Sequence, residues 1–141
     1  GLNTVKNFVA LRYFNVYGPG EEHKDSMQSL VLRIHSSKMF GIFPVNPSRD
    51  FIYVGDVVDA NLHAVKCESG VYDVGSGNSY KYEEICNELN VKYYYADESV
   101  VPKGYQAYTK ADSSKFLPEW KPKNTLKMGL KKYLEYLNEE Y

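Results

Sequence analysis

The chain has 141 residues, 43% of them hydrophobic, which is enough to bury a core as one globular domain. Its 17 basic and 18 acidic side chains nearly cancel, which argues against a nucleic acid or an anionic membrane as partner. No stretch is long and apolar enough to span a bilayer, and two cysteines are too few for a disulfide framework, so we expect a cytoplasmic protein.

The first part of the chain predicts a strand followed by a helix. Gly1 stands where an initiator methionine would be, so we expect the chain to be a piece of something longer. Residues 8–17 are mostly apolar and predict a buried strand, which ends at a turn formed by residues 18–20. A helix is then expected to begin at Ser26, with one apolar face formed by Met27, Leu30, Val31 and Ile34.

The middle of the chain repeats the change from strand to helix. Residues 51–54 predict a strand, and the following helix has Asp56 as a plausible N-cap and an apolar stripe of Val58, Leu62 and Val65. Residues 70–75 predict another strand, followed by a helix that carries Tyr82, Ile85, Cys86 and Leu89. A further strand is expected at residues 91–95. This alternation, without an internal repeat or a linker, predicts a single α/β domain over residues 1–141.

The last part of the chain begins with an irregular segment. Residues 96–122 contain three prolines and Trp120, and we expect them to fold over the functional site. A closing amphipathic helix is predicted from the spacing of Leu126, Leu130, Tyr133, Leu134 and Leu137.

The turn after the first predicted strand is the best candidate for a site. Polar groups and Lys24 gather there, and in open α/β sheets ligands bind beyond the ends of strands. The alternative is that Lys24 is a solvated surface charge, as a single lysine in a polar loop usually is.

Four segments resemble the extended short-chain dehydrogenase/reductases of the NAD-dependent epimerase/dehydratase family: residues 12–19, 23–27, 49–57 and 103–112. The first and third occur across many nucleotide-sugar epimerases and dehydratases. The second and fourth are narrower and are most similar to the ADP-L-glycero-D-manno-heptose 6-epimerases. The resemblance covers only the carboxyl-terminal, substrate-binding part of that Rossmann-type α/β fold, and implies that the amino-terminal dinucleotide-binding half is absent.

The sequence itself agrees with this absence. A dinucleotide fingerprint needs three glycines at set spacing after a strand, but Gly75 and Gly77 are followed by Tyr80 where the last glycine should stand. The family also uses a tyrosine with a lysine four residues later, and none of the 14 tyrosines has one. We therefore expect this chain alone to be inactive.

The resemblance implies an isomerase reaction for the intact protein. In the family, bound NADP oxidises the sugar at one carbon, and the hydride returns to the opposite face of the carbonyl intermediate. The implied reaction inverts C6 of ADP-glycero-manno-heptose, a precursor of the lipopolysaccharide inner core. The NADP is expected to be bound mainly by the absent half.

Such an inversion needs acid/base groups on two sides of the reacting carbon. One is the missing tyrosine, and Lys24 matches the lysine described as the second. Lys24 can act only if burial or a neighbouring cation lowers its pKa, and adjacent His23 could contribute to that environment. In the same comparison Val16 lies near the nicotinamide, so Val16 and Lys24 are the cofactor contacts that we expect.

The resemblance also implies a set of substrate contacts. Asn15 and Ser26 match residues that contact the sugar, and Tyr105 matches a substrate-binding tyrosine. Arg49 resembles the arginine that grips the nucleotide diphosphate, a task suited to its planar set of donors. Phe43 matches the start of the adenosine-contacting loop, which is shorter here.

Three positions depart from the family pattern. Gly20 stands in place of an arginine, Asp25 replaces a glycine beside Lys24, and Arg33 occupies the position of a substrate-contacting histidine. Arg33 therefore leaves the sugar preference open, and a related heptose or hexose nucleotide is an alternative.

Each of these assignments has a simpler structural alternative. Arg49 could pair with Asp50 or Asp56, Asn15 could form a turn at a strand end, and Tyr105 could serve only packing.

Two further features of the sequence do not predict a site. His63 and Cys67 are four residues apart on a predicted helix, but two ligands do not complete a metal site, so none is expected. Five lysines form the expected solvated face of the last helix: Lys121, Lys123, Lys127, Lys131 and Lys132.

Two functions from different classes remain open. The chain is either the substrate-binding part of a nucleotide-sugar epimerase or a separate module that binds a nucleotide sugar without redox chemistry. In both cases, a surface left exposed by the absent half would favour self-association into a homo-oligomer.

Overall fold

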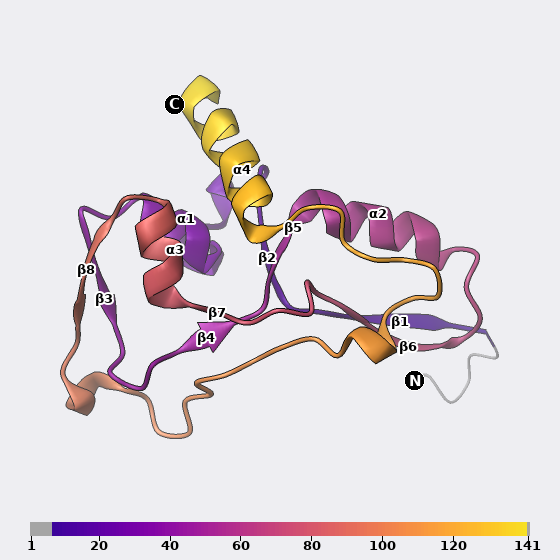
Figure 1. Ribbon diagram of the computed structural model, residues 1–141, viewed down its shortest axis with the longest axis horizontal. Coiled ribbons are helices and arrows are strands. Elements are labelled where there is room, and N and C mark those ends of the chain that lie inside the picture. Colours follow the sequence, from indigo (N-terminus) through magenta and orange to yellow (C-terminus); the bar gives the residue numbers. More distant parts are fainter. Residues whose placement is uncertain (1–6, 141) are drawn as a thin grey trace.

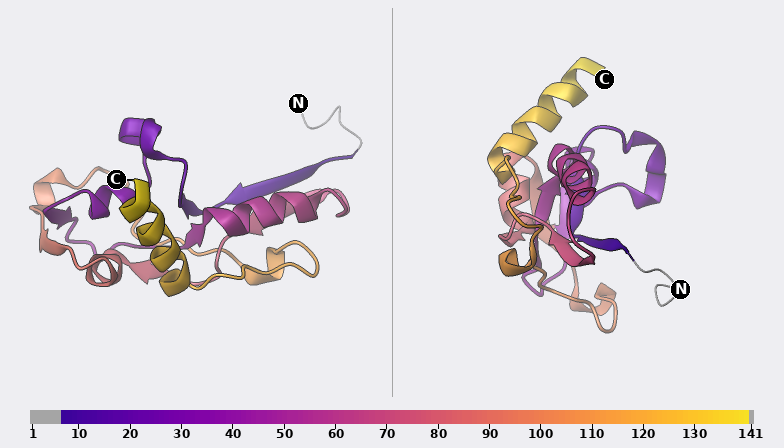
Figure 2. Two further views of the ribbon diagram at one scale, coloured as in Figure 1. Left: turned by 90° about the horizontal axis from the view of Figure 1, so that it is seen from above. Right: turned by 90° about the vertical axis from the view of Figure 1, so that its right-hand side faces the viewer.

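The computed structural model describes residues 7–140 and shows an elongated arrangement of short sheets and helices (Figures 1 and 2). The start of the chain at Gly1 lies outside the described residues. Figure 1 shows a parallel strand pair beneath one helix at one end of the molecule, and a second strand pair with two short helices at the other. The closing helix lies between the two ends.

The first strand segment changes partner halfway along its length. β1 (Val9–Tyr13) pairs in parallel with β6 (Gly70–Val74), whereas β2 (Asn15–Tyr17) pairs in parallel with β5 (Phe51–Tyr53). The change occurs at Phe14, whose amide still donates to the last residue of β6 at 3.1 Å. The single strand predicted over residues 8–17 is therefore two strands, because two different partners bind its two halves.

The remaining strands form two small ribbons. β3 (Met39–Ile42) is parallel to β8 (Lys92–Tyr95), and β4 (Ser48–Arg49) is antiparallel to β7 (Tyr80–Lys81). The strand predicted at residues 91–95 is confirmed as β8. Sequence analysis missed the other three, because strands of two to four residues are too short to show an alternating pattern.

The first helix begins later than predicted. α1 (Leu30–His35) has Ser29 as its N-cap, and the hydroxyl of Ser29 accepts a hydrogen bond from the amide of Leu32 at 3.2 Å. Ser26 lies instead in the preceding 3₁₀ segment η2 (Glu22–Met27), which Asp25 interrupts with a φ of 49°. The predicted start at Ser26 is wrong, and Met27, at 80% exposure, does not share the buried face.

The second helix forms where it was predicted, but its first turn is arranged differently. α2 (Val54–Ala64) follows β5 directly, and its N-cap is Tyr53 rather than Asp56. The buried carboxylate of Asp56 instead accepts hydrogen bonds from the backbone amides of Lys123 and Asn124, at 2.9 and 3.1 Å. Asp56 therefore fastens the segment before the last helix to α2.

The apolar stripe predicted on α2 faces outward. Val58, Leu62 and Val65 lie on one side of the helix and are 55%, 70% and 86% exposed. The buried side carries Val57, Ala60 and Ala64, which pack with Ile52 of β5 and Val74 of β6. The predicted stripe is therefore on the wrong face of the helix.

The last two helices confirm the prediction from periodicity. α3 (Tyr82–Glu88) buries Ile85 and Cys86, and α4 (Leu126–Glu140) buries Leu126, Leu130, Tyr133 and Leu137 in the main core. Residues 96–122 run from one end of the molecule to the other before α4 (Figure 1). Apart from two 3₁₀ turns, η3 (Glu98–Val100) and η4 (Ser113–Lys115), this segment is irregular, as predicted.

The surface of α4 and the hydropathy of the helices agree with the sequence patterns. The five lysines of the expected solvated face are all exposed. Among residues 7–140, no helix combines the length and the apolar character needed to cross a membrane.

Candidate functional site

Arg49 is held in place by rings and backbone carbonyls. Its guanidinium carbon lies 5.7 Å from the centre of the Tyr82 ring and 5.2 Å from that of Tyr105. One terminal nitrogen donates to the carbonyl of Ser48 at 2.9 Å, and the other donates to the carbonyl of Gln106. The side chain is therefore fixed by groups that leave its charge uncompensated.

The carboxylates that could have paired with Arg49 bind elsewhere. Asp50 is fully buried and accepts hydrogen bonds from the amides of Ser76, Gly77 and Ala111, at 2.8 to 3.0 Å. Asp56 binds the segment before α4. Within residues 7–140, Arg49 takes part in no ion pair. Its remaining donors are thus available for an anion from outside the chain.

Two predicted residues join Arg49. The ring of Phe43 meets the ring of Tyr105 edge-on, with centroids 4.9 Å apart. Tyr105 in turn lies against Arg49. Phe43 and Arg49, which were predicted to contact the nucleotide, therefore form one cluster with Tyr105, which was predicted to bind the substrate.

Tyr82 belongs to this cluster and was missed as a site residue. Its hydroxyl lies 3.1 Å from that of Tyr105. Burial raises the pKa of Tyr82, the hydrogen bond with Tyr105 raises it further, and the charges of Arg49 and Arg33 lower it. The side chain of Arg33 is exposed on α1. No sequence signal could have separated Tyr82 from an ordinary core tyrosine on an apolar helix face.

Lys24 lies in a different place. It is exposed on η2 and lines a cavity of about 180 Å³ together with Val16 and residues of the Gly18–Gly20 turn. His23 and Ser26 are also exposed on η2. The structure thus brings together Lys24 and Val16, the two predicted cofactor contacts.

Asn15 faces a second cavity. This cavity has a volume of about 560 Å³ and is shared with Gln106, whose carbonyl binds Arg49. Because neighbouring side chains of a strand point to opposite faces, Asn15 and Val16 open to opposite sides of β2. Arg49 lines neither of these two cavities, so they do not bring Lys24 and Arg49 together.

A buried glutamate that sequence analysis missed holds the loop before Lys24. Glu21 is 5% exposed and accepts hydrogen bonds from the amide of Gly18 at 3.2 Å, the hydroxyl of Ser29 at 2.8 Å and that of Tyr133 at 3.0 Å. It connects the turn after β2 to both α1 and α4. A glutamate in a polar loop carries no sequence signal of such burial.

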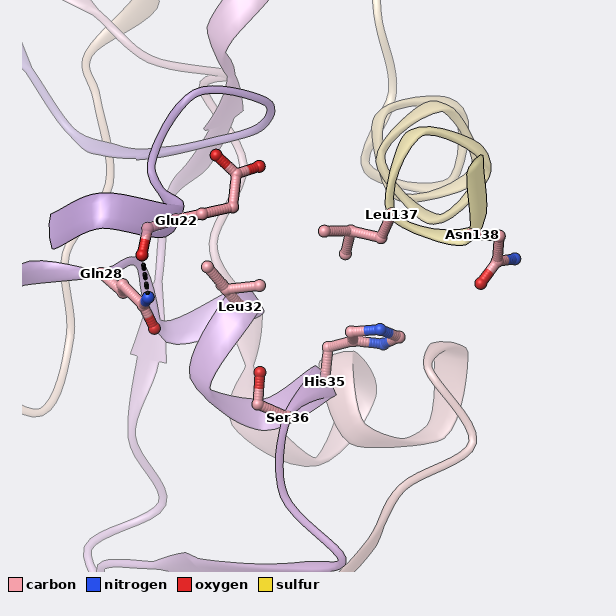
Figure 3. Close-up of a pocket in the computed structure, with 7 residues that line it drawn as sticks. All are labelled: Glu22, Gln28, Leu32, His35, Ser36, Leu137 and Asn138. Atoms are coloured by element: carbon pink, nitrogen blue, oxygen red, sulfur yellow. Dashed lines mark hydrogen bonds between the residues drawn. The ribbon is translucent and has the colours of Figure 1, made fainter. Parts of the chain in front are cut away.

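A third cavity contains none of the predicted site residues. It has a volume of about 500 Å³ and lies between η2, α1 and α4 (Figure 3). Its lining mixes leucines with polar groups: Glu22, Gln28, Leu32, His35, Ser36, Leu137 and Asn138.

The glycine turn after β6 does not fit a dinucleotide. The amides of Ser76 and Gly77, which a pyrophosphate would need, already donate to the carboxylate of Asp50 at 2.8 and 2.9 Å. An anionic pyrophosphate at this turn would be repelled by the Asp50 carboxylate. The turn therefore offers no phosphate site for NAD or NADP.

The side chains of His63 and Cys67 each lie against a backbone carbonyl. A ring nitrogen of His63 lies 2.6 Å from the carbonyl of Pro118, and the sulfur of Cys67 lies 3.5 Å from the carbonyl oxygen of His63.

The relationship of the chain to known proteins follows from its sequence. A model of the NAD dependent epimerase/dehydratase family matches residues 4–75, about half of the chain. The chain belongs to this epimerase/dehydratase family. The name of the family refers to NAD, and among the described residues the turn after β6 offers no phosphate site for that cofactor.

Solved structures of family members are similar over nearly the whole chain. An ADP-L-glycero-D-manno-heptose-6-epimerase from Helicobacter pylori is 33% identical over 92% of the chain, with a TM-score of 0.77. A UDP-glucose 4-epimerase from Thermotoga maritima, solved with UDP-glucose, is 27% identical over 95%, with a TM-score of 0.69. A UDP-N-acetylglucosamine 4-epimerase from Methanobrevibacter ruminantium is 27% identical over 96%, with a TM-score of 0.76. These matches confirm the predicted α/β fold.

The epimerase/dehydratase chain described here is much shorter than these relatives. It spans 44% of the Helicobacter enzyme and 47% of each of the other two.

Proposed function

We propose that this chain is the substrate-binding portion of an NADP-dependent nucleotide-sugar epimerase, whose intact form inverts C6 of ADP-glycero-manno-heptose for lipopolysaccharide synthesis. The observation that carries the proposal is the uncompensated guanidinium of Arg49, held between aromatic rings on backbone carbonyls. The choice of an ADP-heptose is supported by the 33% identity to an epimerase of that substrate and by the segments at residues 23–27 and 103–112.

The nucleotide end of the substrate would bind at the Arg49 cluster. The free donors of Arg49 suit the diphosphate, since a guanidinium binds phosphate oxygens with charge-assisted hydrogen bonds. The half-buried rings of Phe43 and Tyr105 suit the base, because aromatic rings stack favourably on nucleobases.

The sugar end would lie beside the end of β2. Asn15 offers an amide to a sugar hydroxyl, Ser26 offers a hydroxyl, and Arg33 further donors. We propose Lys24 as the acid/base group of this chain. Because Lys24 now faces the cavity on the other side of β2, the proposal requires η2 to carry it toward Asn15 when substrate binds.

The dinucleotide is proposed to be bound by an amino-terminal half outside this sequence. NADP would supply the redox chemistry there, and Val16 would border the nicotinamide. The residues of this chain would bind and orient the nucleotide sugar and move a proton at Lys24.

A second function, a nucleotide-sugar-binding module without redox chemistry, is favoured by one observation. The Arg49 cluster is complete within this chain, whereas its glycine turn is occupied by Asp50. The gene sequence upstream of Gly1 discriminates between the two functions. A glycine fingerprint followed by a tyrosine and lysine four residues apart would support the enzyme, and an initiator methionine directly before Gly1 would support the module.

Calorimetry with the 141-residue chain tests the shared part of both proposals. We expect ADP and an ADP-hexose to bind and NADPH to bind weakly or not at all. Arg49→Ala should weaken ADP binding about 10- to 100-fold, the value of a charge-assisted hydrogen bond, whereas Lys127→Ala on the solvated face of α4 should leave it unchanged. Tight NADPH binding would refute the assignment, and so would an Arg49→Ala variant that binds ADP as tightly as the wild type.

A further inference from the structure

We infer that Tyr82 is a positioning residue, which fastens the irregular segment 96–112 across Arg49 and so holds the anion site in shape. The inference rests on the proposed function of Arg49. It adds a residue that acts through Arg49 and does not contact the substrate.

Tyr82 is well placed for this task because its backbone and ring are both fixed. It is the first residue of α3, and its amide donates to the carbonyl of Pro47 at 3.2 Å, which ties it to the strand that carries Arg49. Its ring packs against Phe51 of β5, with centroids 6.4 Å apart. One ring face therefore supports the guanidinium from a rigid part of the core.

The partner of Tyr82 comes from a segment with little support of its own. Tyr105 lies in the irregular stretch, and its amide donates only locally, to the carbonyl of Pro102 at 3.1 Å. The segment is anchored to β4 a little later, where Ser48 donates to the carbonyl of Ala107 at 2.7 Å. The hydroxyl pair of Tyr82 and Tyr105 therefore adds to the edge-on contact with Phe43 in holding the Tyr105 ring over Arg49.

Together these contacts link Arg49, Tyr82, Tyr105 and Gln106 in one network. Arg49 lies against both tyrosine rings, the two hydroxyls join the rings, and Gln106, next to Tyr105, accepts from the guanidinium. Because Arg49 is already ordered, less conformational entropy is lost when an anion binds. Removing the hydroxyl of Tyr82 should release Tyr105 and loosen Arg49 while leaving the core intact.

The simpler reading is that Tyr82 only fills the core. The two readings differ for Tyr82→Phe, because phenylalanine keeps the packing and the ring beneath Arg49 but removes the hydroxyl. A packing role predicts no change in this variant. A positioning role predicts weaker ligand binding and a more mobile 96–112 segment.

The test combines ADP calorimetry with a double-mutant cycle on the 141-residue chain. Tyr82→Phe and Tyr105→Phe should each weaken ADP binding about 2- to 10-fold, as expected for one lost hydrogen bond. The double variant should be no weaker than either single one, because both remove the same bond. Tyr72→Phe is the matched control, since its hydroxyl donates to the carbonyl of Glu68 away from the site, and should bind as the wild type does.

A second measurement does not depend on the ligand. Lys103 is exposed beside Tyr105, so trypsin cleavage after Lys103 reports on the mobility of the segment. Tyr82→Phe should speed this cleavage several-fold, and Tyr72→Phe should not.

The outcomes separate the inference from the proposed function. If Arg49→Ala weakens ADP binding while Tyr82→Phe changes neither binding nor cleavage, the role of Tyr82 is refuted and the anion site stands. If the wild-type chain does not bind ADP, the proposed function fails, and the cleavage rate alone then supports or overturns the contact made by Tyr82.

Discussion

The carboxylate of Asp50 accepts a hydrogen bond from the backbone amide of Ala111, 61 residues further along the chain, at 3.0 Å. The same fully buried group binds the amides of Ser76 and Gly77 in the turn after β6. One side chain between β4 and β5 thus binds both that turn and the irregular segment.

The first prediction concerns this junction. Asp50→Ala should lower the free energy of unfolding by about 3 kcal/mol or more, because several buried amides lose their acceptor. Asp97→Ala is the control, since its exposed carboxylate caps only the local turn at Ser99. Urea unfolding measures both, and a loss for Asp50→Ala no larger than that for Asp97→Ala would contradict the role of Asp50.

The second prediction concerns the backbone beside Lys24. Asp25 has a φ of 49° and a ψ of −113°, a conformation that favours glycine. Asp25→Gly should therefore raise the free energy of unfolding by about 1 kcal/mol. Asn46 has a φ of 52°, which asparagine tolerates. Asn46→Gly should therefore raise the free energy of unfolding by less than Asp25→Gly does. Thermal unfolding compares the two variants, and equal shifts would argue against strain at Asp25.

The third prediction concerns Lys24 itself. In the intact protein, Lys24→Ala should lower kcat about 100-fold or more, as expected for a lost acid/base group. Because Lys24 is exposed, the free energy of unfolding should change by less than about 0.5 kcal/mol. Lys38→Ala, which removes another exposed lysine, should keep full activity. Unaltered turnover of Lys24→Ala would remove this residue from the mechanism.

The fourth prediction concerns stability at alkaline pH. Burial raises the pKa of Tyr17, Tyr82 and Tyr133 above the ordinary value of 10.0, so above pH 10 the unfolded chain loses these protons before the folded one. Stability should be fully present below pH 10 and fall as the pH rises beyond it. Tyr133→Phe should be less stable at neutral pH, because it loses the hydrogen bond to Glu21, but its stability should fall less steeply above pH 10. A slope equal to that of the wild type would exclude Tyr133 as a contributor.

The fifth prediction concerns self-association through α2. Val58, Leu62 and Val65 form an exposed apolar stripe, and such patches favour association in water. If the stripe is the contact, Leu62→Lys should shift the chain toward the monomer in sedimentation experiments. Met128→Lys, a change of another exposed apolar residue on α4, should not. An oligomer that survives Leu62→Lys must use another surface.

Much of the local structure could be predicted because it depends on neighbouring residues. The periodicity of Leu126, Leu130 and Leu137 predicts α4 correctly, and the glycine-bounded run at residues 70–75 predicts β6. The helix starts at Ser26 and Asp56 were wrong, because a cap depends on which groups are free to bind it. Asp56 binds the segment before α4, and the true cap of α1 is Ser29.

The candidate site also has parts that follow from local sequence and parts that follow from contacts between distant segments. The sequence determined that the chain is an α/β member of the epimerase/dehydratase family, because motifs and local patterns are properties of contiguous residues. Only the tertiary structure decided that Tyr82 and Tyr105 lie against Arg49, that Arg49 has no carboxylate partner within residues 7–140, and that Lys24 faces another cavity. These facts depend on contacts between segments far apart in the chain, which a local pattern does not encode.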